Sequence, residues 1–73
     1  MSKLPVISGK DLVKALTKQG YYIRGQTGSH IHLRHHVKPA ITIPNHPTIS
    51  RGTLNAIIKQ LGMTREEFIE MLA

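Results

Sequence analysis

Apolar residues recur with helical spacing near the start of the chain. The apolar positions that follow Ser8 lie on one helical face and stop before Gly20, so we expect a helix over residues 9–19. Ser8 with Asp11 forms a box typical of a helix start, and a glycine commonly follows the last helical turn. The residues expected to face the core are Leu12, Val13, Ala15 and Leu16.

The next part of the chain has the alternating pattern of β-strands. Residues 21–26 are rich in aromatic and β-branched side chains, and Thr27-Gly28-Ser29 is a turn signal. Residues 30–34 and 40–43 alternate between polar and apolar, and Pro44 is expected to end the last strand. The connections are too short for parallel crossovers, so we expect an antiparallel three-stranded meander with one apolar face.

Two more helices are expected in the last third of the chain. Thr48 or Ser50 can cap the first of them, and Gly62 closes it. Thr64 with Glu67 is a second capping box, which opens a terminal helix. The core stripe of the first helix is expected to be Leu54, Ile57, Ile58 and Leu61, and the terminal helix carries the apolar residues Phe68, Ile69 and Leu72.

Length and composition limit the architecture. At 73 residues the chain has room for one domain, and we expect residues 1–73 to form an α+β fold of order α-β-β-β-α-α, with helices covering one face of the sheet. The sequence has no cysteine, which excludes disulfides and favours a cytoplasmic location. No apolar run approaches the roughly 18 residues of a membrane span, and the N-terminus has no secretory signal.

The charge is strongly positive and unevenly distributed. The net charge is +6, and the residues up to Lys59 carry nine Lys or Arg against one acidic residue. Such a basic body favours a polyanionic partner, while the acidic end suits a solvated helix face or a protein contact. Lys10, Lys14 and Lys18 form a ridge on the first helix, which serves either phosphate contact or simple solvation.

The tripeptide Gly28-Ser29-His30 places an imidazole at the start of a strand, directly after a turn. The chain has five histidines, and three readings of them are open. His30 and His32 share a strand face and could be two metal ligands, but the third ligand is not evident. His35, His36 and His46 favour an idle surface role, and one histidine in a basic cleft could instead transfer protons.

Proton transfer by a single histidine suits the cleavage of RNA. RNA supplies its own nucleophile in the 2′-hydroxyl, so cleavage needs a base, an acid and cations that stabilise the phosphorane charge. The few carboxylates cluster near the C-terminus and do not suggest a Mg²⁺ site. Ser29 and His30 are strand neighbours pointing to opposite faces, which argues against a hydrolase dyad. We therefore expect no metal and no small-molecule cofactor.

The order of several motifs resembles the HicA toxin family, the mRNA interferases of type II toxin–antitoxin systems. The segment SGKDLVKALTKQGYYIRGQTGSHIHLRH is similar to the opening helix, the first strand and the Gly-Ser-His motif of that family. The segment AITIPNHPTISRGTLNAIIKQLGMTREEFIEML resembles its third strand, Pro-x-His segment, Gly-Thr-Leu helix and terminal helix. The resemblance implies a fold like that of a double-stranded-RNA-binding domain, which agrees with the expected order of elements.

The resemblance also implies roles for individual residues. The catalytic histidine of the family falls on His30, and the glycine and serine of the motif fall on Gly28 and Ser29, which are expected to contact RNA. The implied activity is metal-independent endoribonuclease cleavage of mRNA, with a HicB-type antitoxin protein as partner. The basic residues expected to hold RNA phosphate are Lys10 and Arg51, where the family is commonly basic, and Lys14, Arg34 and Lys38.

Two other functions remain open on the sequence. A catalytically silent RNA-binding module of the same fold would use this charge equally well, because double-stranded RNA is recognised through phosphates and 2′-hydroxyls. A structural or inhibitory protein could use the same charge to bind an acidic protein. Substitution of His30 separates the nuclease from the silent binder, and salt-dependent affinity for RNA argues against the third function.

Overall fold

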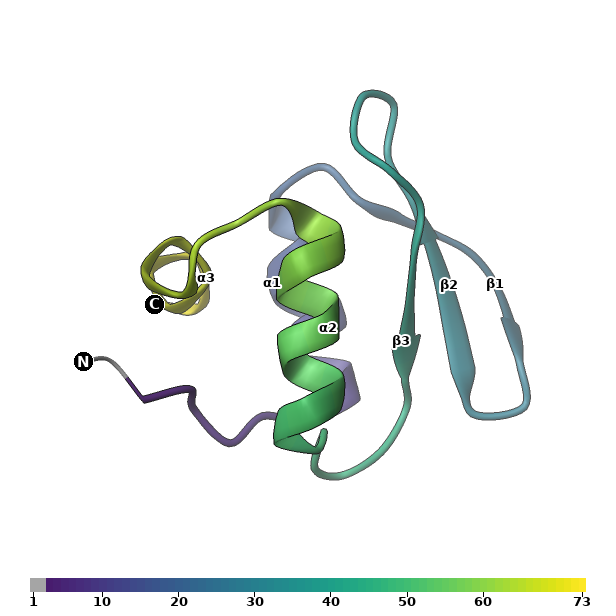
Figure 1. Ribbon diagram of the computed structural model, residues 1–73. Coiled ribbons are helices and arrows are strands. Elements are labelled where there is room, and N and C mark those ends of the chain that lie inside the picture. Colours follow the sequence, from purple (N-terminus) through teal and green to yellow (C-terminus); the bar gives the residue numbers. More distant parts are fainter. Residues whose placement is uncertain (1–2) are drawn as a thin grey trace.

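The computed structural model describes residues 3–73 and contains the expected order of helices and strands (Figure 1). The expected α+β class and the α-β-β-β-α order of a double-stranded-RNA-binding domain are therefore confirmed. The elements are α1 (Gly9–Lys18), β1 (Tyr22–Thr27), β2 (His30–Arg34), β3 (Ile41–Pro44), α2 (Arg51–Leu61) and α3 (Arg65–Leu72).

The three strands form one antiparallel sheet in the order β1-β2-β3. In the β2–β3 pair, Ile31 lies opposite Ile43 and Leu33 lies opposite Ile41. Directly paired residues share a face, so this register gathers the apolar residues of both strands on one side. All four of these side chains are buried, as the alternation predicted.

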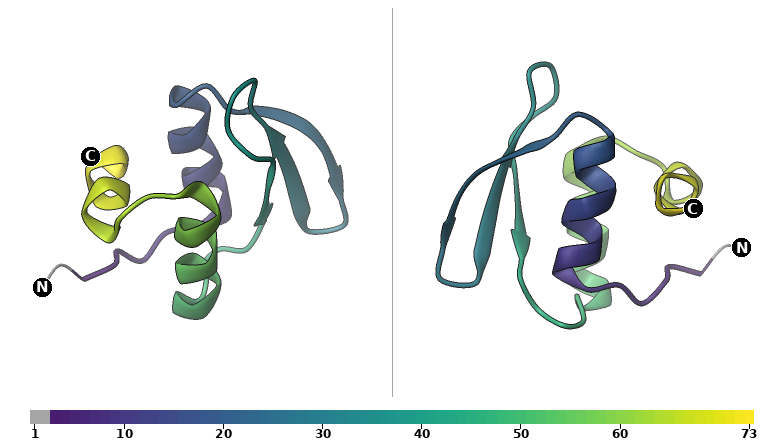
Figure 2. Two further views of the ribbon diagram at one scale, coloured as in Figure 1. Left: turned by 45° about the horizontal axis from the view of Figure 1, so that its top comes forward. Right: turned by 180° about the vertical axis from the view of Figure 1, so that it is seen from behind.

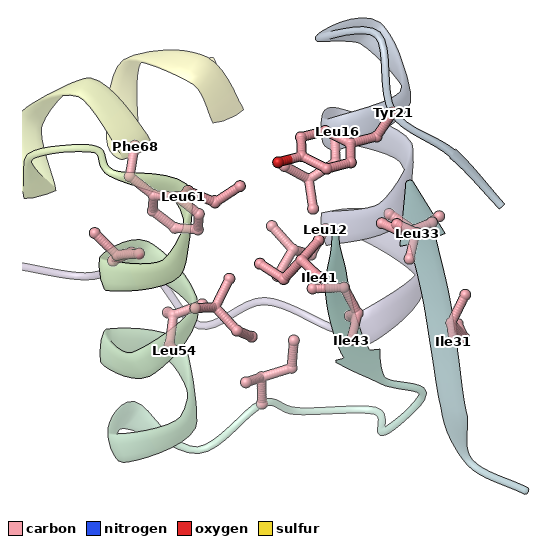
Figure 3. Close-up of a cluster of buried hydrophobic side chains, with 14 residues drawn as sticks. Leu12, Leu16, Tyr21, Ile31, Leu33, Ile41, Ile43, Leu54, Leu61 and Phe68 are labelled. Carbon is pink, nitrogen blue, oxygen red and sulfur yellow. The ribbon is translucent and has the colours of Figure 1, made fainter. Parts of the chain in front are cut away.

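The helices pack on the apolar face of β2 and β3 (Figure 2). α1 and α2 both lie against β3, and α3 packs beside α1. Phe68 of α3 is completely buried, although it belongs to the last and shortest helix. Figure 3 shows these side chains meeting between the helices and the sheet, which makes a single apolar core.

β1 begins one residue later than expected, because the Tyr21 amide takes part in the hydrogen bonds that close α1. The Tyr21 amide donates to the Leu16 carbonyl and the Gly20 amide donates to the Thr17 carbonyl, which is a Schellman closure of the helix. Gly20 has a φ of +96°, as this motif requires. Tyr21 is consequently turned into the core and is not available to the sheet.

The helices cover one face of the sheet, as expected, but β1 extends beyond them. The pairing with β2 is interrupted between Ile23 and Gly25, where Arg24 is the extra residue of a bulge. Ile23 lies opposite Leu33 but remains 57% exposed, and the ribbon shows β1 as the strand farthest from α1 and α2 (Figures 1 and 2). The helices are too few to reach across all three strands.

Local hydrogen bonds explain where the helices start. Ser8, Ser50 and Thr64 each accept a hydrogen bond from a backbone amide three residues later, so Ser50 rather than Thr48 caps α2. Pro44 ends β3, as expected, and is its last residue, paired with His30. This position on an edge strand tolerates a residue without an amide proton. Within residues 3–73 no helix is long and apolar enough to cross a membrane.

Candidate nucleic-acid interface and catalytic site

The β1–β2 turn presents His30 at one end of the sheet. Thr27 and His30 are paired, so Gly28 and Ser29 form a two-residue hairpin loop. Gly28 has a φ of +57° and Ser29 does not have a positive φ, which is the pattern of a type II′ turn. The Gln26 side-chain amide donates to the Gly28 carbonyl at 2.9 Å and supports the turn. His30 follows directly as the first residue of β2, with its side chain exposed.

A second histidine lies at the same end of the sheet. His30 is paired with Pro44, and the next residue, Asn45, donates its amide to the Ser29 carbonyl at 2.6 Å. The chain therefore runs past His30 just before it reaches His46. His30 and His46 line one hollow, together with Thr42, Pro44, Thr48, Ser50 and Thr53.

The N-terminus of α1 holds the loop that carries His46. The Gly9 amide donates to the His46 carbonyl at 2.9 Å, and the Ile49 amide donates to the Ile7 carbonyl at 2.9 Å. Gly9 approaches the loop so closely that a β-carbon there would lie 2.1 Å from the Pro44 carbonyl oxygen. The absence of a side chain is thus what allows the helix and the loop to meet.

The surroundings of the two histidines favour an anion. Lys10 and His46 line a second, adjoining hollow, together with Ser8, Asn45 and Pro47. The N-termini of α1 and α2 lie at this same end of the molecule, the lower end in Figure 1. Helix N-termini carry partial positive charge, so they add to the Lys10 ammonium group. No carboxylate is among the residues that line either hollow.

His32 has a structural role in the centre of the sheet. Its Nδ1 lies 3.1 Å from the Thr42 hydroxyl and its Nε2 lies 3.2 Å from the Thr27 hydroxyl, so the ring bridges β3 and β1. Because both ring nitrogens are occupied, His32 is poorly placed to serve as a metal ligand beside His30. Within residues 3–73 no three side chains of metal-binding type gather into a possible site.

His35 and His36 stabilise the sheet end opposite His30. The His35 Nε2 lies 3.0 Å from the Gln19 carbonyl oxygen, to which it must donate, so Nδ1 accepts hydrogen bonds from the Val37 and Lys38 amides. The ring of His36 contacts that of Tyr22, with 5.5 Å between their centroids. These contacts give both side chains a packing role that the sequence pattern did not reveal.

The Tyr21 side chain ties the long β2–β3 connection to the core. Its hydroxyl donates to the Pro39 carbonyl at 3.1 Å, and its ring contacts that of His35. Burial raises the pKa of the Tyr21 hydroxyl above its ordinary value. This connection is therefore anchored by side chains, although it contains no helix or strand.

The basic residues expected to hold RNA lie on several sides of the molecule. Lys14 and Lys18 line a hollow beside Met71 and Leu72 of α3, so this part of the ridge faces α3 and not the hairpin. Arg51 begins α2 but lines another hollow, with residues 4–6 of the N-terminal segment. Of the expected cations, Lys10 alone shares a hollow with one of the two histidines described above.

Arg34 and Lys38 lie toward the other end of the sheet. A rise of about 3.3 Å per residue puts Arg34 about 13 Å along β2 from His30. Arg34 lines a hollow on the strands with Arg24 and His32, and Lys38 lies in the β2–β3 connection beyond it. An RNA strand would have to extend along the sheet to meet both ends.

A comparison with sequence profiles of known families identifies the relationship. The profile described as "HicA toxin of bacterial toxin-antitoxin" matches residues 9–63. The chain belongs to the HicA toxin family. The match includes the two histidines and Lys10 and ends before α3, so the resemblance suggested for the terminal helix lies outside it.

A solved structure supports the same relationship for this HicA-family toxin. A chain from a structure titled "Toxin-Antitoxin complex from Streptococcus pneumoniae" is 36% identical to it, with a TM-score of 0.67. The aligned region covers 78% of this chain and 98% of that chain. No curated protein sequence matches the chain.

The HicA-family fold brings together a different set of residues from the one expected. His30, Gly28 and Ser29 lie together in the turn, and Lys10 lies near them across the Pro44–His46 loop. His46 was expected to be an idle surface residue. The sequence marked it only through the Pro-x-His segment of the family resemblance, and its nearness to His30 depends on the β2–β3 register.

Proposed function

We propose that this toxin is a metal-independent endoribonuclease that cleaves mRNA, with His30 as a general acid or base. The observation that supports the proposal best is the position of His30. It is exposed and lines a hollow that has no carboxylate among its lining residues, and its ring makes no hydrogen bond to other side chains or backbone of residues 3–73. The ring is therefore available to exchange protons with a bound substrate.

The proposed reaction uses the 2′-hydroxyl of RNA as the nucleophile. The O2′–P bond forms as the P–O5′ bond breaks, which leaves a 2′,3′-cyclic phosphate and a 5′-hydroxyl. His30 either accepts the 2′-hydroxyl proton or supplies the proton to the departing 5′-oxygen. In this proposal the Lys10 ammonium group and the two helix N-termini stabilise the added negative charge on phosphorus.

Substitution of His30 tests the proposal. His30→Gln should lower the rate of RNA cleavage by about 10²- to 10⁴-fold, which is the usual contribution of a general acid or base. His36→Gln is the matched control, because His36 is also exposed but lies near the other end of the sheet. Cleavage is followed on labelled mRNA with EDTA present. An unchanged rate for His30→Gln, or RNA binding without any cleavage by the wild type, would favour the silent RNA-binding module instead.

The cations are proposed to hold RNA through its phosphates. Each neutralised phosphate of a single strand should contribute about 0.7 to the slope of log affinity against log salt. Lys10→Gln should reduce this slope, since Lys10 adjoins the proposed reaction site. Lys14→Gln with Lys18→Gln tests the remaining ridge on α1, and Arg34, Lys38 and Arg51 can be examined in the same way.

We also propose that the partner of this toxin is an antitoxin of HicB type. The related structure is titled a toxin–antitoxin complex, and that relationship supports an antitoxin for this chain. Because the proposed substrate is mRNA, the toxin would act in the cytoplasm. Coexpression with the cognate antitoxin should protect cellular mRNA from wild-type toxin, whereas His30→Gln toxin should leave mRNA intact with or without the antitoxin.

A further inference from the structure

We infer that His46 is the second proton-transferring group and acts together with His30. This inference rests on the proposed ribonuclease function and identifies the acid–base partner that such a reaction requires. The two side chains come from different parts of the chain, one from β2 and one from the β3–α2 loop, and line the same hollow.

The backbone holds His46 in place from two sides. Before it, the Asn45 amide donates to the Ser29 carbonyl, which ties the loop to the residue preceding His30. The His46 carbonyl itself accepts a hydrogen bond from the Gly9 amide. These bonds fix the main chain of the loop against both the hairpin turn and α1. The arrangement suits a residue whose side chain must be positioned although it is exposed.

The side-chain contacts of the histidines separate two of them from the others. His32 and His35 use both ring nitrogens in hydrogen bonds, and His36 contacts an aromatic ring. Neither His30 nor His46 has a side-chain hydrogen bond within residues 3–73. His36 also makes no hydrogen bond, but it lies near the other end of the sheet, so His30 and His46 are the histidines with free nitrogens that share this hollow.

The chemistry requires two groups with opposite tasks. One neutral imidazole takes the proton from the 2′-hydroxyl as the O2′–P bond forms. One imidazolium gives its proton to the 5′-oxygen as the P–O5′ bond breaks, so the proton count balances over the step. The other polar side chains in the hollow are the hydroxyls of Thr42, Thr48, Ser50 and Thr53, which do not titrate near neutral pH. His46 is therefore the group in this hollow that can complement His30.

The test compares His46→Gln with His30→Gln and with the control His36→Gln. A site cleaved by the wild type is first mapped, and a short RNA around it is made twice, with oxygen or with sulfur as the bridging 5′-atom. A thiolate leaves without protonation, so cleavage of the sulfur substrate does not need the general acid. Rates are measured across pH, and far-ultraviolet circular dichroism checks that each variant is folded.

His46→Gln should lower cleavage of the oxygen substrate by about 10²-fold or more and should remove one limb of a bell-shaped pH profile. The sulfur substrate should restore the rate of one histidine variant but not the other, which identifies the acid. A folded His46→Gln protein that cleaves at the wild-type rate would overturn the inference. So would a lower rate with an unchanged pH profile, if the sulfur substrate also showed no difference between the two histidine variants. If His46→Gln were fully active and His30→Gln inactive, the proposed ribonuclease function would stand without the inference about His46. Full activity in both variants would refute the proposed function and the inference together.

Discussion

Gly9→Ala should disturb the loop that carries His46 without changing either histidine. A β-carbon at this position would lie 2.1 Å from the Pro44 carbonyl oxygen and 3.0 Å from the Asn45 α-carbon. Both of those atoms belong to the backbone, so no side-chain rotation relieves the contact. The loop must retreat from α1 by about 1 Å to reach an ordinary separation. That movement also stretches the hydrogen bond from the Gly9 amide to the His46 carbonyl.

The expected cost combines two effects. Forcing an extra methyl group into a close contact typically costs about 1–3 kcal/mol, and a weakened backbone hydrogen bond adds up to about 1 kcal/mol. The better helix propensity of alanine offsets at most about 1 kcal/mol. We therefore expect the free energy of unfolding to fall by about 1–3 kcal/mol. For a domain of this size each kcal/mol corresponds to about 4–8 °C in Tm.

Gly52→Ala is the matched control, since Gly52 also lies in the first turn of a helix. A β-carbon at Gly52 meets nothing within 4 Å, so this change should stabilise the protein by about 0.4–1 kcal/mol. Thermal and urea unfolding followed by circular dichroism measure both variants. RNA cleavage by folded Gly9→Ala at low temperature should also fall, by up to about 10²-fold for a displacement near 1 Å. If Gly9→Ala matched Gly52→Ala in stability and the wild type in cleavage, the close contact would not determine the position of the loop.

Three further changes test other parts of the fold. Tyr21→Phe removes the hydrogen bond to the Pro39 carbonyl and should lower the free energy of unfolding by about 0.5–1.5 kcal/mol, measured by urea unfolding. Gly28→Ala meets no steric contact but must adopt a positive φ, so a loss of about 1–2 kcal/mol in the same assay should accompany weaker RNA cleavage. Thr64→Ala should cost about 1 kcal/mol through the lost cap of α3. The hydrogen bond from the Thr64 backbone amide holds the pKa of Glu67 below its ordinary value of 4.5. The stability that this bond adds is therefore present above pH 4.5 and is lost as the pH falls through the lowered pKa. Glu67→Gln should remove this part of the pH dependence of stability.

The parts of the fold that depend on local signals were predictable from the sequence. Ser8 and Thr64 mark helix starts because the side chain and the amide it accepts from are only three residues apart. The strict alternation from His30 to Arg34 fixed which side chains face the core. Tyr21 was misassigned because an aromatic residue before a strand looks like strand, while its amide is used to close α1.

The candidate site was predictable only in part, because it depends on contacts between distant residues. His30 stood out through its turn, which is a local feature. His46 becomes meaningful only when β3 is placed in register beside β2, and a connection held by His35 and Tyr21 precedes that strand. No pattern in residues 35–40 specifies such side-chain contacts. The same limit applies to Lys14, whose position beside α3 follows from tertiary packing.

The bonds that hold the His46 loop have a consequence for a toxin that is still being synthesised. The Gly9–His46 and Ile7–Ile49 bonds join segments from the two halves of the chain, and α2 must be present to complete the core beneath β3. Closing such long loops costs chain entropy that is recovered only when the distant segments meet. A nascent chain that has already exposed His30 therefore lacks the support of an assembled site. The arrangement makes the proposed activity a property of the assembled fold, which requires the segment before α1, the His46 loop and α2 to be present together.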